Sequence, residues 1–481
     1  MTLLALSQAQ APNPWMVLPF VALLAIIALA PLLFADWWTR FYPAVALSLG
    51  AVVIAYYAVG LQAFDQLAHT GHEYVSFICL IGSLYIVSGG IHIQVRGETT
   101  PGFNTAFLFA GALLANILGT TGASMLLIRP WIRMNKYRLT GHHIVFFIFI
   151  VSNVGGCLTP IGDPPLFLGY LKGIPFWWVA EHCWPIWAVG LGILLAMFLV
   201  VDTLNFRKAP RAVRAEHVDE PDWFRFEGLG NLFFLAMILG AILFAERPAF
   251  LREGIMLAAA AGSYFTTRRD IHQANHFNFH PVQEVAILFV GIFATMMPAL
   301  DWLSQKAGAL GHPSPAFFYW GCGILSSVLD NAPTYLGFLS AIFGAYVDAD
   351  TVQQVQHLVQ TGGADLSTFV HGEHSEQIRN TFAALQKFHG DAVARRQVDV
   401  EAIEMAFLLG NAAFNHFIVA ISVGAVFFGA NTYIGNGPNF MVKAIADHQG
   451  AKTPSFLGYI FRYSLPIMLP MLVVVWLIFF R

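Results

Sequence analysis

Charge is scarce in this sequence. Only 11% of the 481 residues are charged and 57% are hydrophobic, whereas soluble domains carry roughly 25% charged residues. The 25 Lys and Arg residues nearly balance the 28 Asp and Glu residues and form no basic face, so nothing points to a nucleic-acid partner. We therefore expect a polytopic membrane protein whose surroundings are the lipid bilayer.

Cysteines are also few and form no recognisable pattern. Cys79, Cys157, Cys183 and Cys322 all lie in apolar stretches, without the spacing of metal ligands or of a disulfide framework. The sequence also lacks a Walker motif, a nucleophile elbow and a dinucleotide-binding fingerprint. We therefore expect no cofactor and no enzymatic activity.

Apolar runs of about 20 residues, long enough to span a bilayer, recur along the chain. The uninterrupted runs are 15–34, 42–64, 73–94, 177–201, 229–246, 251–267, 282–300 and 457–480. Runs 104–129 and 313–346 are broken around Gly119 and Asp330, and each is predicted to be a re-entrant hairpin. Runs 143–172 and 405–447 are too long for one straight helix, and each is predicted to be a discontinuous span.

The two discontinuous runs carry one repeated signature. Gly156–Phe167 and Gly429–Phe440 match in Gly, Thr, Ile, Gly, Pro and Phe at a constant spacing. In hydrocarbon, unwound backbone persists only where protein or a water-filled cavity satisfies its polar groups. Paired breaks in corresponding halves are typical of transporters built from inverted repeats. The predicted fold is therefore an all-α polytopic membrane protein with two inverted repeats, each containing a re-entrant hairpin and a discontinuous transmembrane helix.

This repeat divides the chain into an N-terminal extra helix (1–36), a first repeat (37–202), a cytoplasmic linker (203–227) and a second repeat (228–481). The hairpin and the discontinuous span are farther apart in the second half, and the polar segment 347–404 accounts for the difference. We expect this segment to be an extracytoplasmic insertion, either an amphipathic cap or a separate binding domain. Most Lys and Arg residues outside it fall on one face, which the positive-inside rule makes cytoplasmic.

Polar residues at the four breaks form one predicted site near the membrane midplane. An aspartate at the bilayer centre costs at least about 2.5 kcal/mol to insert, so Asp163 and Asp330 are expected to bind the transported Na⁺. The alternative is that each caps a half-helix. Asp163 matches Asn436 in the signature, and the motif holding Asp330 is loosely equivalent to the one holding Asn116. The predicted ion-binding residues are Asp163, Asp330, Asn331, Asn153, Thr159, Asn116, Thr120, Thr121, Thr334, Asn431, Thr432 and Asn436. Two further acids, Glu73 and Glu284, are expected at the membrane interface.

Three motifs in order, Asn153–Pro165, Leu329–Thr334 and Gly429–Asn439, resemble those of the ion transporter superfamily with its citrate-transporter-like domain. The resemblance is greatest to the NhaD-type sodium/proton antiporters, and it covers most of the chain outside the insertion and the N-terminal region. It implies a scaffold that forms a homodimer and a transport domain that contains the hairpins. The superfamily also includes citrate and dicarboxylate symporters and arsenite exporters. The paired Ser-Asn-Thr triplets of its divalent-anion branch are missing, since Ser152-Asn153-Val154 stands in the first half and no such triplet occurs in the second.

The predicted function is exchange of cytoplasmic Na⁺ or Li⁺ for external protons by alternating access, in a bacterial inner membrane. A carboxylate cannot hold a proton and Na⁺ together, so competition couples the two ions, and burial moves the pKa of a carboxyl upward, toward working pH. One alternative is a cation-coupled citrate or dicarboxylate symporter, which the lack of Arg or Lys within the four motifs disfavours; the nearest are Arg129 and Lys172 at segment ends. A second is a membrane sensor whose insertion binds a ligand, which the intact acidic motifs disfavour.

Overall fold

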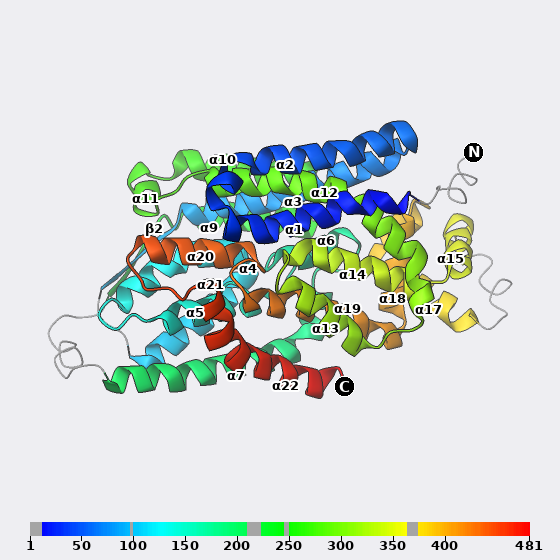
Figure 1. Ribbon diagram of the computed structural model, residues 1–481. Coiled ribbons are helices and arrows are strands. Elements are labelled where there is room, and N and C mark those ends of the chain that lie inside the picture. Colours follow the sequence, from blue (N-terminus) through cyan, green and yellow to red (C-terminus); the bar gives the residue numbers. More distant parts are fainter. Residues whose placement is uncertain (1–11, 97–99, 209–222, 245–249, 363–373) are drawn as a thin grey trace.

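The computed structural model of the protein describes residues 12–96, 100–208, 223–244, 250–362 and 374–481. Helices make up nearly all of this structure (Figure 1). Eight helices among the described residues are long and apolar enough to cross a membrane, which confirms the predicted all-α polytopic membrane protein. The start of the N-terminal extra helix (1–11), most of the expected linker (209–222) and part of the insertion (363–373) lie outside the described residues.

Six helices on one side of the molecule are called the outer group here (Figure 1). In this group α2 packs on α1 and α12, while α3 packs on α10 and α12. Its members are α1 (Leu18–Leu33), α2 (Ala35–Ala55), α3 (Phe64–Gly89), α9 (Asn231–Phe244), α10 (Leu251–Thr266) and α12 (His280–Lys306). Only 22% of the apolar stretch of α1 is buried inside the protein, so its exposed surface is suited to lipid.

The four breaks lie on a second set of helices, called the site group. Its members are α4 (Pro101–Met134), α5 (Gly141–Ile150), α6 (Pro164–Leu171), α13 (Pro315–Ser326), α14 (Asn331–Tyr346), α19 (Ala412–Phe428) and α20 (Gly437–His448). Helices α7 (Trp178–Lys208), α21 (Phe456–Tyr459) and α22 (Leu469–Phe479) flank it. Short 3₁₀ segments are η2 (Pro14–Val17), η4 (Val154–Gly156), η6 (Ala307–Leu310) and η7 (Gly429–Asn431), and π-helical segments are η3 (Tyr56–Gly60) and η8 (Ile460–Met468). Helix α5 is apolar on nearly all sides and is buried along its length, as expected at the centre of a bundle.

The first predicted hairpin is present, because α4 doubles back at Gly119. This residue has φ of 75° and ψ of 155°, a conformation that glycine adopts far more easily than other residues. The two ends of α4 meet, since Asn104 Nδ2 donates to Asn135 Oδ1 over 2.8 Å. A straight helix would hold these residues about 45 Å apart.

The second hairpin consists of α13 and α14, which are joined at Asp330. Its base is closed by the Tyr346 hydroxyl, which donates to the carbonyl oxygen of Pro313. Helix α14 continues toward α15 at one end of the molecule, whereas the base of α4 lies beside the last turns of α7 at the other end (Figure 1). The two hairpins therefore enter the helix bundle from opposite ends of the molecule.

The predicted insertion contains α15 (Ala349–Thr361) and α17 (Ser375–Ala394), which pack with α18 (Val400–Gly410) around their own apolar cluster, including Val355, Leu385 and Ile403. Helix α18 begins inside the segment 347–404 and continues past its end. The run 405–447 has a further break that was not expected, because Asn411 is extended between α18 and α19.

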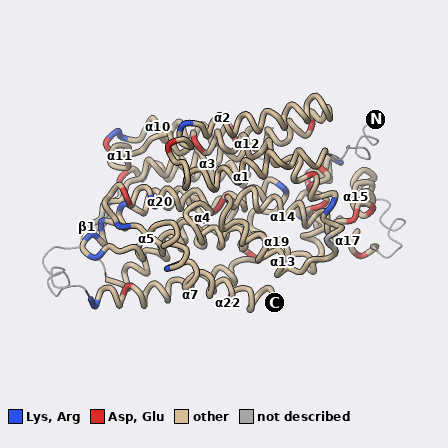
Figure 2. Tube along the Cα trace, in the orientation of Figure 1, with Lys and Arg blue, Asp and Glu red and all other residues tan. Residues whose placement is uncertain are grey.

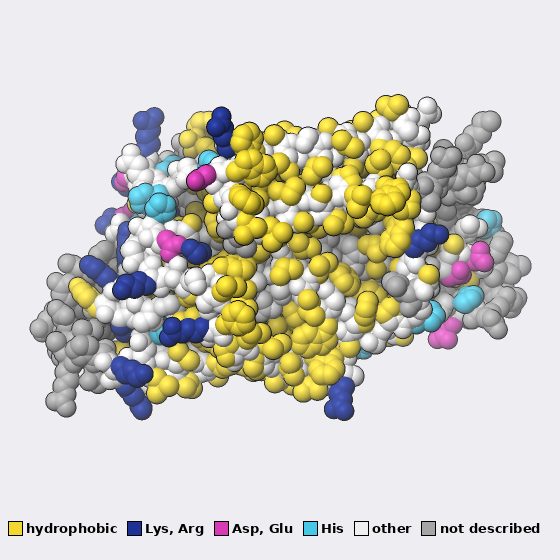
Figure 3. Space-filling model, viewed as in Figure 1, with side chains coloured by type: hydrophobic (Ala, Val, Ile, Leu, Met, Phe, Trp, Pro, Cys, Tyr) yellow, Lys and Arg dark blue, Asp and Glu magenta, His cyan; other side chains and the backbone are white. Residues whose placement is uncertain are grey.

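Charge is distributed unevenly between the ends of the molecule. Strand β1 (His92–Arg96) pairs antiparallel with β2 (Trp223–Glu227) at one end, near α11 (Arg269–Ala274). Lys and Arg residues gather mainly at this end (Figure 2), and hydrophobic side chains cover much of the middle of the face shown in Figure 3. Arg129 differs from the expectation that it lies at a segment end, because it is buried within α4.

Candidate functional site

The two signature loops fold in the same way. Thr159 Oγ1 donates to the Asn116 carbonyl oxygen over 2.6 Å, and Thr432 Oγ1 donates to the Ser327 carbonyl oxygen over the same 2.6 Å. Each threonine hydroxyl also accepts an N–H bond of 3.1 Å from the glycine three residues later. Ser327, rather than a residue beside Asp330, therefore occupies the position of Asn116. The same register pairs Asp330 with Gly119, three residues after Asn116 in the first break, and so agrees with the loose equivalence expected between the two motifs.

Glycines let each loop close on itself. A Cβ on Gly162 would overlap the carbonyl oxygen of Gly156, and a Cβ on Gly435 would lie 2.6 Å from the carbonyl oxygen of Gly429. Side-chain amides complete the loops. Asn116 donates to Gly155 O over 2.7 Å and accepts from Leu158 N over 2.9 Å; Asn431 donates to Ser327 Oγ over 2.9 Å. Asn116, Thr159, Asn431 and Thr432 thus support the unwound backbone.

Asp163 lies where both hairpins and both loops meet. Its side chain does not cap α6. Oδ1 accepts from Thr120 Oγ1 at the tip of the first hairpin over 2.8 Å and from Asn436 Nδ2 over 3.0 Å. Oδ2 accepts from Asn331 Nδ2, at the start of α14, over 2.5 Å. The residue is 1% exposed, so three neutral donors surround a buried carboxylate.

Asn331 contributes an unused oxygen beside this carboxylate. Its Nδ2 faces Asp163, while its Oδ1 is buried and has no hydrogen-bond partner among the described residues. A buried amide oxygen without a partner costs about 1–3 kcal/mol. Amide and carboxylate oxygens are ligands that suit hard cations, so this pair of groups can bind one.

A chain of amides joins the two loops. Asn439 is fully buried, and its Nδ2 donates to the carbonyl oxygens of Gly429 and Thr432 over 2.8 and 2.9 Å. Its Oδ1 must therefore face Asn153 Nδ2, which lies 2.7 Å away. Asn153 Oδ1 in turn accepts from Asn436 Nδ2 over 3.2 Å. Asn439 is missing from the predicted site residues, although it lies within the second signature.

Asp330 lies apart from the hydrogen bonds of Asp163. Its Oδ1 accepts from Ala332 N over 3.0 Å, and Thr334 Oγ1 donates to its carbonyl oxygen over 2.9 Å. The capping alternative therefore describes Asp330 and not Asp163. With Thr121 and Asn436, Asp330 lines a cavity of about 60 Å³ between the site group and α12, which is room for about two water molecules.

Four helix starts point toward this region, namely the second arm of α4, α6, α14 and α20. The N-termini of helices carry partial positive charge, which stabilises the Asp163 carboxylate. The side-chain donors to Asp163 are Thr120, Asn331 and Asn436, and the donor to the Asp330 side chain is the backbone N–H of Ala332. Among the described residues, no Lys or Arg lines the 60 Å³ cavity. The nearby charge balance therefore favours binding of a cation.

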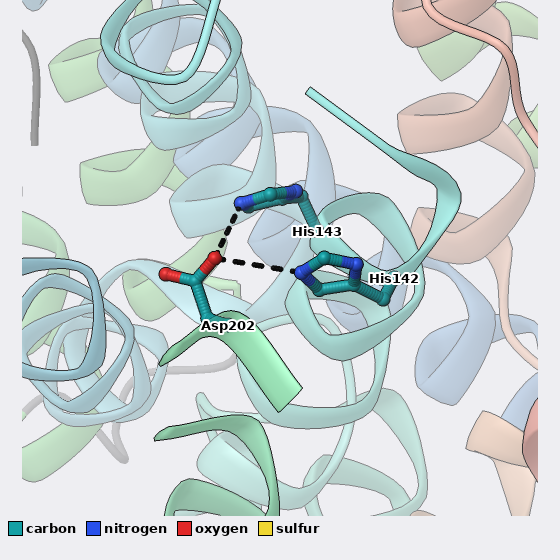
Figure 4. A group of neighbouring side chains, drawn as sticks. All are labelled: His142, His143 and Asp202. Atoms are coloured by element: carbon teal, nitrogen blue, oxygen red, sulfur yellow. Dashed lines mark hydrogen bonds and ion pairs between the residues drawn. The ribbon is translucent and has the colours of Figure 1, made fainter. Parts of the chain in front are cut away.

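A second buried polar cluster, His142, His143 and Asp202, lies at the base of the first hairpin (Figure 4). Asp202 is fully buried and forms an ion pair with Arg138. His143 Nδ1 accepts the Thr140 N–H over 3.2 Å, so its Nε2 carries the proton and donates to Asp202 Oδ1 over 3.0 Å. Because a guanidinium already supplies the positive charge, this cluster anchors α4, α5 and α7 and does not fit a metal ion. Asp202 is 60 residues from His142, and no sequence motif connects it with the histidines.

No curated protein matches the sequence. Among protein families, residues 9–480 match the one described as "Putative citrate transport". This match covers nearly the whole chain, including both signatures and both hairpins, and it agrees with the expected citrate-transporter-like domain of the ion transporter superfamily. A transport role, and with it a multi-pass integral membrane protein, follows from this match together with the apolar helices. The chain therefore belongs to this citrate-transport family of membrane proteins.

Proposed function

We propose that the protein exchanges Na⁺ or Li⁺ for protons and that Asp163 is the carboxylate for which the two ions compete. The observation that carries this proposal is the buried Asp163 carboxylate, bonded only to neutral donors, beside the unpartnered Oδ1 of Asn331. A buried negative charge without a counterion is strongly disfavoured. Such a group gains by binding either a proton or a small cation.

In this mechanism Asp163 visits both sides of the membrane with one occupant at a time. With a proton bound, the carboxyl is neutral; with Na⁺ bound, Asp163 and Asn331 Oδ1 contribute oxygen ligands. Two occupants cannot share the carboxylate, so neither ion crosses without the other returning. Asp330, Thr121 and Asn436, which line the adjacent cavity, are proposed to form the approach to this site.

Opposite entry of the hairpins and the matched bonds of the two loops support an inverted-repeat arrangement, in which one group of helices moves against the other. The concentration of Lys and Arg at the β1–β2 end supports a cytoplasmic location for that end. We propose a homodimer in a bacterial inner membrane, with the outer group as its scaffold.

Citrate symport is the second candidate, because the family description names citrate transport. The described site does not favour it: the cavities that adjoin the two hairpin tips have volumes of about 30 and 60 Å³, and neither is lined by Lys or Arg. A tricarboxylate needs more room and positive groups that match its carboxylates. Binding of citrate would therefore require a substantially different conformation.

Purified protein in proteoliposomes with a preformed pH gradient separates these candidates. Addition of Na⁺, Li⁺, K⁺, citrate or succinate is followed with an internal pH dye, with protein-free liposomes as the control. Gradient collapse on Na⁺ or Li⁺ without an organic anion supports antiport. Uptake of radiolabelled citrate that depends on a cation, with no collapse on Na⁺ alone, would refute it.

A further inference from the structure

One lysine connects the end of the site helix α6 to two other parts of the molecule. Lys172 follows α6 directly, and its Nζ lies 2.9 Å from Glu73 Oε1 on α3. The same Nζ lies 2.9 Å from Glu401 Oε1 on α18. The outer group, the site group and the inserted segment therefore share one ammonium group.

These charges lie in a largely enclosed position. The side chains of Lys172 and Glu73 are only 11% and 8% exposed, so Glu73 is buried within the protein. His69 Nε2 lies 3.4 Å from both Glu73 Oε1 and Glu401 Oε2. Because separating a buried ion pair leaves uncompensated charge, the pair resists displacement of α6 from α3.

The network also forms a wall between two cavities. Lys172, His69 and Glu401 line a cavity of about 530 Å³ beside the inserted segment. The same three residues line another of about 150 Å³, which extends along α12 and α14. Opening the network would join the space beside the insertion to the flank of the second hairpin.

Helix α6 transmits this contact to the site. It spans eight residues from Pro164 to Leu171, about 12 Å, with Asp163 immediately before it and Lys172 immediately after it. Movement of α6 against α3 must separate Lys172 from Glu73. Glu401 can remain with Lys172, because α18 leads directly into α19 of the site group.

We propose that Lys172 is a positioning residue whose pair with Glu73 locks α6 and Asp163 against α3. Glu401 of the inserted segment competes for Lys172 and weakens this lock. The inserted segment thereby influences the balance between the two conformations of the transporter. This inference rests on the proposed function only in assuming that the site group moves against the outer group.

Accessibility of a single introduced cysteine tests the lock without a transport measurement. Thr121→Cys places a thiol in the cavity beside Asp330, and the four native cysteines are buried. The rate of reaction with a membrane-impermeant maleimide is measured from each side of oriented vesicles. The ratio of the two rates reports how often each face opens to the site.

Glu73→Gln should change this ratio at least about fivefold, and Glu401→Gln should change it in the opposite direction, because Lys172 then pairs with Glu73 alone. Glu253→Gln is the matched control: Glu253 is buried and bonded to Arg252 and Ser76, but all three lie within the outer group. It should leave the ratio unchanged.

A ratio within twofold of the parent in both variants would overturn the lock, as would a shift of both in the same direction, which loss of stability alone would produce. If Glu73→Gln fails to fold, the sign of the Glu401→Gln shift decides, because the Glu401 side chain is 41% exposed and tolerates change better. If the wild-type protein shows no Na⁺ exchange in proteoliposomes, the proposed function is refuted. The cysteine-labelling ratio would still test the lock.

Discussion

Replacement of Asp163 with Asn tests the site most directly, because it keeps the side-chain shape and removes the charge. The carboxylate accepts two bonds at Oδ1 and one at Oδ2. An amide has only one oxygen, so its NH₂ group must face a former donor. Facing Asn331 is least costly, since Asn331 can rotate its amide and present the Oδ1 that has no partner in the wild type.

This rotation gives the new amide an acceptor but turns Asn331 Nδ2 toward the position where Oδ1 has no partner in the wild type, so the unfolding free energy of Asp163→Asn should fall by about 1–3 kcal/mol. Exchange should fall at least about 100-fold, equivalent to about 2.7 kcal/mol. The variant has neither the titratable proton nor the negative charge, and the rotated Asn331 has no oxygen left for a cation.

The assay compares Na⁺-driven dissipation of a pH gradient in proteoliposomes with the apparent melting temperature in detergent. Asp301→Asn is the control, because Asp301 on α12 accepts from Tyr57 over 2.6 Å and from Gln66 over 2.9 Å, outside the Asp163 network. It should keep the wild-type KM for Na⁺. Exchange by Asp163→Asn within fivefold of the wild-type rate would refute this account of the site.

Three other substitutions test the positioning of Asn153 by Asn439, the anchoring of helices by Asp202 and the titration of Glu404. Asn439→Ser removes the acceptor for Asn153 and should raise the KM for Na⁺ about tenfold. Asn411→Ser, at a buried break outside the chain of amides, should leave the KM unchanged. Equal KM values in the two variants would contradict a positioning role for the chain of amides. Asp202→Asn leaves Arg138 buried without its counterion and should cost about 3–5 kcal/mol, seen as a large drop in melting temperature; an unchanged melting temperature would remove the anchor role. Burial, and then repulsion from Glu401, raises the pKa of Glu404 from 4.5 to about 7; Glu404 lies on α18, outside the candidate spans. The folded chain then holds a proton that the unfolded chain has lost, so stability falls as pH rises from 4.5 to about 7. The unfolding free energy of Glu404→Gln, relative to that of the wild type, should therefore be higher at pH 8 than at pH 4 by on the order of 1–3 kcal/mol. A difference in melting temperature between variant and wild type that does not change with pH would contradict this.

The breaks could be predicted from sequence because hydrocarbon tolerates so few irregular segments. Gly119 and the repeated signature stand out in apolar runs for that reason. The partners of each polar group could not be predicted. Asn331 and Asp163 are 168 residues apart, and only the packing of the second hairpin against the first loop makes them neighbours. Asn439 lies within the signature, but nothing in its spacing indicates that its amide turns back to Gly429. The Arg138 and Asp202 pair, 64 residues apart, likewise depends on how α4 and α7 end.

The equivalent positions Asp163 and Asn436 explain why the buried network holds one charge. Their backbones are nearly the same, with φ and ψ of −143° and 144° at Asp163 and −154° and 139° at Asn436. Their side chains meet at 3.0 Å. Two aspartates at this separation could not both ionise and would share a proton. The amide at Asn436 instead donates to Asp163, and Asp330 is engaged in capping α14. One carboxylate is thus left free to exchange a proton for a cation, so the difference between two otherwise matched loops favours one proton per Na⁺ in the proposed cycle.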